Sequence, residues 1–324
     1  MSSLKFWQAV NRALDEELAC DKSVILFGED VGKAGGPFGA SRGLYDKYGA
    51  LRVRDTPISE SAITGVAVGA AMCGLRPIVE IMYFDFITLA MDQLINQAAK
   101  MRYMSGGSLS VPMTLLTFCG AGRGSGPQHS QSLEGWLAHI PGISVLYPSN
   151  PADAKGLLKS AIRSNDPAVF ISSSRLWTMR GEVPDGNEMI PIGKASIIRP
   201  GFDVTIVSWG WATQRCLIAS ELLSNQGIEA EIIDLRTISP LDTITILESV
   251  ARTGHLFVVN DASGPYGPGA EISAVVAEHG FTSLKAPIRR INAPFAPAPF
   301  STDLELQFYR TPEEIAYAVS SNLL

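Results

Sequence analysis

The chain has 324 residues, of which 46% are apolar and 18% charged, a composition that excludes a largely disordered or coiled-coil protein. Its formal net charge is −6, without a long run of Lys or Arg, so nucleic acid and anionic membranes are poor candidate partners. The length predicts two domains, and four scattered cysteines without a CxxC pair indicate neither a zinc site nor a disulfide framework.

The first twenty residues have the pattern of an amphipathic helix and lack the apolar core of a signal peptide. We therefore expect a cytoplasmic protein, or an organelle-matrix protein whose transit peptide has been removed. The uncharged stretch from Tyr103 to Gly122 is interrupted by Gly106, Gly107 and Pro112. It is predicted to be a loop followed by a buried strand, and not a membrane span.

Short apolar runs alternate with longer helical patterns along the chain. In the first half, the predicted strands are Val24–Asp30, Arg76–Tyr83, Val111–Phe118, Ile143–Pro148 and Pro167–Ser172, and the predicted helices are Ser59–Gly74 and Asp85–Met104. In the second half, the predicted strands are Asp203–Gly210, Ala230–Leu235 and His255–Asn260, with helices ending at Asn225 and near Leu241–Thr253. Strands separated by helices of this length indicate parallel sheets with right-handed crossovers, and therefore an α/β fold.

Residues 173–201 interrupt this alternation with three prolines and no clear periodicity. We interpret this region as containing the connection between two parallel-sheet α/β domains, of which the second is smaller. The predicted boundaries are 1–178 for the first domain, 179–201 for the linker and 202–324 for the second domain.

The sequence GAGRGSG at Gly120–Gly126 follows a predicted strand, where a dinucleotide-binding fingerprint would lie. The third glycine of that fingerprint would have to stand at position 125, which is Ser125. Because the third glycine is needed for close packing of helix on strand, the match fails.

Glu60 lies in DTPISE, where the helix of small residues begins. One interpretation is structural, with Ser59 as the N-cap and Glu60 at the positive end of the helix. The other interpretation places the carboxyl group in a dry cleft, where it shares a proton with a ligand nitrogen.

His129 lies in the polar loop GPQHSQS, which follows a strand at the carboxyl edge of the predicted sheet. Ligands of open α/β sheets bind at that edge, but a histidine in such a loop can also be a surface or capping residue. His139, in LAHIPG, is an equally good candidate for a structural role.

The combination of motifs is more specific than any single residue. The motifs are GEDVG (Gly28–Gly32), RVRDTPISE (Arg52–Glu60), GLRPIVEIMYFDF (Gly74–Phe86), DQLINQAAKMRYMSGG (Asp92–Gly107), QHSQSLEGW (Gln128–Trp136), HIPG (His139–Gly142), DAKGLL (Asp153–Leu158) and EIIDLRTISPLD (Glu231–Asp242). In order and spacing this set resembles the β subunit of the thiamine-dependent, decarboxylating component of 2-oxo acid dehydrogenase complexes. Pyruvate, branched-chain and acetoin dehydrogenases are members of that family.

The resemblance implies an N-terminal pyrimidine-binding α/β domain and a C-terminal transketolase-like α/β domain. It also implies that Glu60 contacts the aminopyrimidine of thiamine diphosphate and that His129 faces the reacting substrate and the incoming lipoyl group. A carboxyl group that shares its proton with the aminopyrimidine favours the tautomer that activates the cofactor. An imidazole so placed is a suitable proton donor or acceptor.

Further site residues follow from the resemblance alone. Met82 and Phe86 match positions that pack against the aminopyrimidine, although ordinary core packing would explain them equally well. Some relatives hold potassium with main-chain carbonyl groups at positions that match Met113, Ala161, Ile162, Ser164 and Asp166.

The resemblance also implies partners. Thiamine enzymes anchor the diphosphate through magnesium bound by a GDG motif, and this sequence contains no GDG. A separate α subunit is therefore expected to hold the magnesium, in an α₂β₂ heterotetramer that serves a lipoyl acyltransferase core. The helix of small residues at Ser61–Gly74 is a candidate subunit contact, with packing inside one domain as the alternative.

Two departures from the family pattern leave the substrate open. Ser172-Ser173 stand where an acidic residue and Asn or His are usual, and Asn260-Asp261 stand where two acids are usual. The leading hypothesis is an enzyme subunit that decarboxylates a 2-oxo acid and acylates a lipoyl carrier. The alternatives are a two-component transketolase-like enzyme, which passes a two-carbon unit to another acceptor, and a catalytically silent scaffold.

Overall fold

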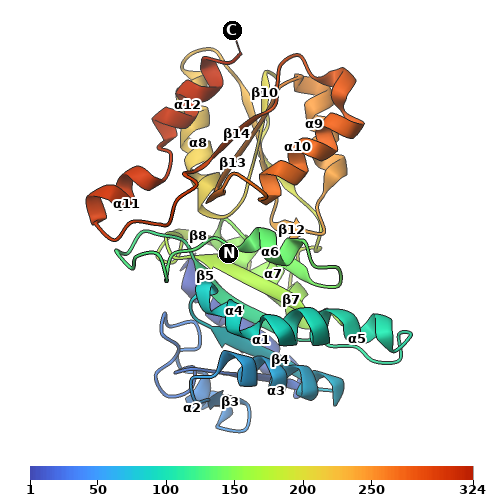
Figure 1. The fold of residues 1–324 in the computed structure, drawn as a ribbon. Helices are drawn as coiled ribbons and strands as arrows, with labels where there is room; N and C mark the ends of the chain where they lie inside the picture. The colour runs from blue at the N-terminus through green and yellow to red at the C-terminus, as the bar shows by residue number, and fades with distance from the viewer. Residues whose placement is uncertain (324) are drawn as a thin grey trace.

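A seven-stranded sheet is the centre of the N-terminal half of the computed structural model, which describes residues 1–323 (Figure 1). In spatial order its strands are β12 (Thr237–Ser239), β6 (Ser144–Leu146), β7 (Ala168–Ser173), β5 (Thr114–Cys119), β4 (Arg76–Ile81), β2 (Val24–Gly28) and β3 (Val53–Asp55). All are mutually parallel except β12, which comes from the C-terminal half and pairs antiparallel with β6. The two halves of the chain therefore share this sheet.

Helices cover both faces of the larger sheet. One face packs against α1 (Phe6–Cys20), α2 (Leu44–Tyr48) and α7 (Pro151–Arg163), and the other against α3 (Glu60–Met72), η1 (Phe84–Phe86), α4 (Ile87–Asp92), η2 (Gln93–Ala98), α5 (Ala99–Met104) and α6 (Glu134–Ala138). Successive side chains of a strand point to opposite faces, so Ile78 belongs to the first core and Val79 to the second. β5 is buried along its whole length, and burial on both faces explains why most of its residues are apolar.

The smaller sheet has five strands, in the order β14 (Arg289–Ala293), β13 (Leu256–Ser263), β10 (Val204–Ser208), β11 (Ala230–Asp234) and β9 (Ser196–Arg199). They are parallel except β9, which pairs antiparallel with β11. The remaining C-terminal elements are α8 (Gly210–Ser224), α9 (Thr243–Thr253), α10 (Pro268–His279), η3 (Phe281–Ser283), α11 (Thr302–Phe308) and α12 (Pro312–Ser320). The predicted α/β fold with two parallel-sheet halves is confirmed; Leu324, the last residue of the predicted second domain, lies outside the described residues.

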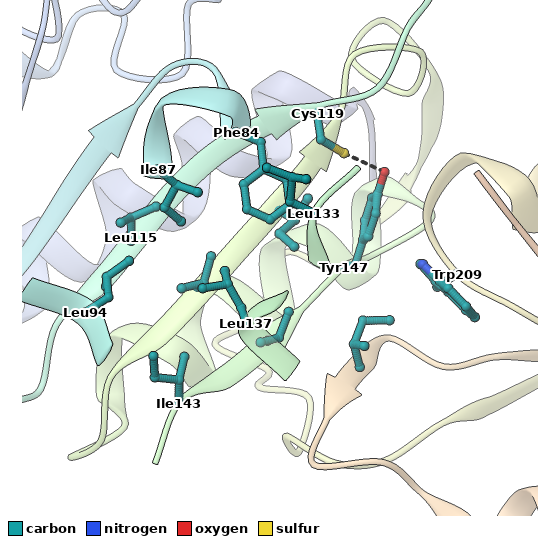
Figure 2. Packing of buried hydrophobic residues seen from close by; sticks show 14 of the residues in the cluster. Phe84, Ile87, Leu94, Leu115, Cys119, Leu133, Leu137, Ile143, Tyr147 and Trp209 are labelled. Atoms are coloured by element: carbon teal, nitrogen blue, oxygen red, sulfur yellow. Dashed lines mark hydrogen bonds between the residues drawn. The ribbon is translucent and has the colours of Figure 1, made fainter. Parts of the chain in front are cut away.

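One hydrophobic core continues from the first half into the second. Figure 2 shows Phe84, Leu115 and Leu137 packed in this core, near the hydrogen bond of 2.8 Å between the Cys119 sulfur and the Tyr147 hydroxyl. At the junction, the buried indole Nε1 of Trp209 donates to Glu134 Oε1 at 3.0 Å. Burial raises the pKa of the Glu134 carboxyl group above its ordinary value.

Most predicted strands and helices are present, with differences where the sequence pattern is weak. A strand, β1 (Ser2–Lys5), precedes α1, and it pairs antiparallel with β8 (Arg180–Val183). β8 and β9 lie in the region of three prolines, and they escaped prediction because both are short edge strands with mostly solvent-accessible side chains. The helix predicted at Asp85–Met104 contains a π-helical turn, η2, which shifts the apolar period.

No helix within residues 1–323 combines the length and the hydropathy needed to cross a membrane.

Candidate active site

The candidate site lies at the carboxyl edge of the larger sheet. β2, β4 and β5 are neighbours and parallel, so the loops that follow them meet at one edge. These loops carry Glu29, Tyr83 and His129, and β3 beside them leads into α3, which begins at Glu60. This is the edge at which open α/β sheets bind ligands.

Glu60 is the first residue of α3 and is only 7% exposed. Ser59 occupies the N-cap position, but its side chain makes no capping hydrogen bond. The prediction that the Ser59 side chain caps the helix is therefore wrong. Burial raises the pKa of the Glu29 carboxyl group, and the nearby acidic groups of Glu60 and Asp30 raise it further. The acidic group of Glu60, at the start of α3, therefore acts on Glu29, which directly follows β2.

The imidazole of His129 lies nearly perpendicular to two neighbouring aromatic rings. Its centroid lies 5.0 Å from that of Tyr83 and 5.3 Å from that of Phe86, with interplanar angles of 87° and 82°. The structure thus brings Phe86 and His129 together, although they are far apart in the sequence. Half-burial of the imidazole leaves part of it accessible to a ligand.

The positions of Met82 and His139 give weaker support for a role in this site. Met82 directly follows β4 and is half-buried. His139 is exposed and lies just after α6, where it lines a groove with Trp136 and Tyr266 instead of the edge that carries His129.

Several buried polar atoms near this edge have no hydrogen-bond partner in the described residues. They are Thr56 Oγ1, Asp85 Oδ2, Ser130 Oγ and Ser132 Oγ, all from segments that follow β3, β4 or β5. The other carboxyl oxygen of Asp85 accepts from the amide of Gln131 at 3.2 Å and from its side chain at 2.8 Å. Because buried polar groups are rarely left unpaired, this donor and acceptor set fits a polar heterocyclic ligand held next to aromatic rings.

Glu80 is a second buried carboxyl group, on β4 itself. It lies 2% exposed beside Gly28 of β2, and neither of its carboxyl oxygens has a hydrogen-bond partner among residues 1–323. Burial raises the pKa of Glu80 to about 8, so its carboxyl group is mainly protonated at neutral pH.

The carbonyl groups considered for potassium lie around the end of α7 and the starts of β5 and β7. The carbonyl oxygens of Ile162 and Ser164 both accept from Nη1 of Arg76, at 3.1 and 2.7 Å. The carbonyl oxygens of Met113 and Ala161 accept backbone amides at 3.0 and 3.1 Å. Each carbonyl oxygen has a second lone pair, so the set could still contact a cation, but Arg76 already supplies a positive charge there.

Asp166, the fifth predicted member, forms an ion pair with Arg102. Within residues 1–323 there is no group of three or more His, Cys, Asp or Glu side chains that could hold a metal ion.

Sequence analysis missed Tyr83, Glu29 and Asp85 as parts of this site. Glu29 lies in GEDVG and the other two in GLRPIVEIMYFDF, so all three belong to motifs at strand ends. Their position at or next to the carboxyl ends of predicted parallel strands was the signal available, because such positions converge on one edge.

Two family models match this chain: "Transketolase, pyrimidine binding domain" over residues 2–178 and "Transketolase, C-terminal domain" over residues 193–315. The chain is 47% identical over 325 residues to the acetoin:2,6-dichlorophenolindophenol oxidoreductase subunit beta of Cupriavidus necator, covering 97% of this chain and 96% of that protein. It is also 47% identical over 302 residues to the mitochondrial pyruvate dehydrogenase E1 component subunit beta-2 of Oryza sativa subsp. japonica, covering 92% and 80%.

Among solved structures, a split-gene transketolase described as an inactive beta4 tetramer is similar, with a TM-score of 0.81. The similarity covers 98% of this chain and 97% of that chain at 20% sequence identity, a level that shows the shared fold alone.

Proposed function

Because this chain belongs to the family of β subunits of 2-oxo acid dehydrogenases, we propose that it supplies the pyrimidine-binding half of a thiamine diphosphate site. The complete enzyme would decarboxylate a 2-oxo acid and transfer the acyl group to a lipoyl carrier. The observation that carries this proposal is the convergence of Glu60, Phe86 and His129 on one edge of the larger sheet.

Bound thiamine diphosphate would supply the nucleophilic carbon and the electron sink for decarboxylation. Glu60 would hold a proton in a hydrogen bond to a ring nitrogen, a role that suits a carboxyl group only 7% exposed. Met82 and Phe86 would pack against the pyrimidine ring. The unpaired hydroxyl groups near this edge would complete its hydrogen bonds.

His129 would face the substrate and the incoming lipoyl group. Ring contacts with Tyr83 and Phe86 would restrict the orientation of the imidazole and leave its nitrogen atoms for the reaction. The nitrogens would then donate or accept a proton at the reacting centre during acyl transfer.

A separate α subunit would complete the site and hold the magnesium that anchors the diphosphate. The names of the relatives support this part, because they are beta subunits, and the sequence has no GDG motif of its own. We propose an α₂β₂ heterotetramer that works with a lipoyl acyltransferase core. The cytoplasmic or matrix location, the domain boundaries at 178 and 201, and the potassium site belong to this proposal as well.

The transketolase-like alternative is less well supported. The relatives at 47% identity are subunits of an oxidoreductase and of a dehydrogenase, whereas the likeness to transketolase at 20% identity concerns the fold. Two of the residues that depart from the family pattern have structural contacts here: Asn260 donates to Asn292 Oδ1 at 2.7 Å, and Asp261 pairs with Arg215. They do not point to one 2-oxo acid.

Reconstitution tests the proposed function. The chain would be co-expressed with a GDG-containing α subunit encoded beside it, and a series of 2-oxo acids would be screened with 2,6-dichlorophenolindophenol as electron acceptor. We expect dye reduction with at least one 2-oxo acid, and acylation of a lipoyl domain by the same substrate. Transfer of a two-carbon unit to an aldose without dye reduction would favour the transketolase-like alternative.

A further inference from the structure

The glycine-rich loop of residues 120–126 joins β5 to the segment that carries His129. Four of its residues have positive φ angles, of 88°, 133°, 63° and 74°: Gly120, Gly122, Gly124 and Gly126. Glycine adopts such conformations with little strain, which explains the alternation in GAGRGSG. The amide of His129 donates to the Gly126 carbonyl at 3.3 Å, so this loop leads directly into the turn at His129.

A segment from the other end of the chain holds this loop. We call residues 294–309 the C-terminal strap; in Figure 1 its helix, α11, reaches from the C-terminal half to the green loop of the N-terminal half. Glu305 accepts the amide of Gly122 at 2.6 Å with Oε1 and the amide of Gly124 at 3.1 Å with Oε2. The hydroxyl of Tyr309 accepts the amide of Ala121 at 2.7 Å.

The contact between strap and loop is buried and close. Glu305 is 2% exposed and Tyr309 is 5% exposed, although the rest of α11 is largely accessible. A Cβ atom at Gly126 would collide with the ring of Phe300, and one at Gly122 would collide with Arg175. The loop therefore approaches Phe300 of the strap closely at Gly126 and the Arg175 side chain closely at Gly122.

The arrangement is similar to an anion-binding site whose acceptor comes from the same chain. Backbone amides of a bent loop, here those of Gly122 and Gly124, offer a concave group of donors that suits a carboxyl group. The two oxygens of Glu305 each take one amide, so neither donor is left unpaired in a buried position. Burial also raises the pKa of the Tyr309 hydroxyl group, which keeps it neutral as the third acceptor.

We propose that Glu305, together with Tyr309, fixes the loop of residues 120–126 and thereby orients His129 beside Tyr83 and Phe86, so that Glu305 is a positioning residue. Loss of the Glu305 contacts would release the Gly122 and Gly124 amides and free the loop that leads to His129. The consequence for catalysis rests on the proposed function of His129; the consequence for loop order does not.

Hydrogen exchange tests whether Glu305 orders the loop of residues 120–126, and it needs no measurement of enzyme activity. In Glu305→Gln, an NH2 group replaces one of the two carboxyl oxygens, so the loop amide that donated to that oxygen faces another donor. We expect exchange in the peptide covering residues 120–126 to accelerate roughly tenfold to a hundredfold, as for loss of a strong hydrogen bond. Asp303→Asn is the matched control, because Asp303 lies on the same helix and is exposed, and its exchange should equal that of the wild type.

Unchanged exchange in Glu305→Gln, or equal acceleration in Asp303→Asn, would overturn the proposal. If Glu305→Gln does not fold, Tyr309→Phe keeps the buried ring and removes only the acceptor for Ala121. Faster exchange confined to the loop of that variant supports the proposal, and exchange at the wild-type rate overturns it.

The reconstituted enzyme tests whether Glu305 acts through His129. A displaced catalytic group can lower kcat by about a hundredfold, so we expect a decrease of that order in Glu305→Gln. The double variant Glu305→Gln/His129→Ala should then be no slower than His129→Ala alone, because residues that act as a unit are not additive. Multiplicative losses would overturn the positioning role. If the wild type turns over no 2-oxo acid, the proposed function fails. The exchange result still decides whether Glu305 orders the loop.

Discussion

At the scale of single residues, the proposed chemistry depends most on Glu60. The amide of Glu60→Gln cannot share a proton with a ring nitrogen as a carboxyl group does. We therefore expect turnover of the reconstituted enzyme to fall by about two to four orders of magnitude, with the assembly intact. The rate of deuterium exchange at the thiazolium carbon of the cofactor is the measurement. A wild-type exchange rate in the variant would show that Glu60 has only a structural role at the end of the helix.

Two measurements on His129→Ala distinguish a catalytic role of His129 from a structural one: the stability of the variant and its rate of lipoyl acylation. The side chain is half-buried in a polar loop, so we expect His129→Ala to change the free energy of unfolding by no more than about 1 kcal/mol. Loss of a proton donor or acceptor should slow lipoyl acylation by roughly 10²–10⁴-fold. A variant with a much lower melting temperature and near-normal specific activity would show that His129 is structural.

The raised pKa of Glu80 predicts that the stability of the fold depends on pH. Its pKa is about 8 in the folded chain against an ordinary value of 4.5, so the folded state binds the extra proton between these values. The free energy of unfolding therefore falls as pH rises from 4.5 towards 8, by at most roughly 1.4 kcal/mol per pH unit from this group. Below pH 4.5 the carboxyl group is protonated in both states, and the contribution of Glu80 is constant.

Glu80→Gln should remove that slope. Denaturant unfolding of wild type and variant at pH 5, 6, 7 and 8 is the measurement, and the variant should gain stability relative to the wild type at each step. Glu182→Gln, at an exposed position in β8, is the control and should show a constant difference. A constant difference for Glu80→Gln as well would mean that Glu80 does not titrate above its ordinary range.

At the scale of elements, the strands that contain apolar runs could be predicted from the sequence. β5 and β10 are buried along their whole length and were recognised, whereas β8 and β9 are four-residue edge strands without such a run. The strand β12 was missed because its three residues are ordered by pairing with β6, which is about ninety residues away in the sequence. Tertiary pairing of this kind leaves little local signal.

The junction between α6 and α8 gives a prediction at the same scale. Trp209→Phe keeps a buried ring but removes the donor to Glu134 Oε1, and Glu134 Oε2 already has no partner among residues 1–323. We expect the free energy of unfolding to fall by about 1–3 kcal/mol. Trp136→Phe is the control, since Trp136 is 56% exposed and its loss should cost no more than about 0.5 kcal/mol. Equal effects of the two substitutions would show that the Trp209–Glu134 hydrogen bond contributes nothing.

At the scale of the whole molecule, the sequence motifs identified the family and two residues that the structure places at one edge, Glu60 and His129. The contact of Glu305 with Gly122 and Gly124 was not predictable, because it joins residues more than 180 positions apart. The glycines at alternate positions were tested as a dinucleotide-binding fingerprint, a match that failed, and they gave no sign that a carboxyl group of the same chain accepts the loop amides. Such contacts follow from the packing of the two halves and have no local pattern.

The central claim is that this chain provides only half of a thiamine diphosphate site. Calorimetric titration of thiamine diphosphate with magnesium into the chain alone, and into the chain assembled with its α subunit, tests it most directly. We predict weak binding that does not depend on magnesium for the chain alone, and tight magnesium-dependent binding for the assembly. Tight magnesium-dependent binding by the isolated chain would contradict the two-subunit site.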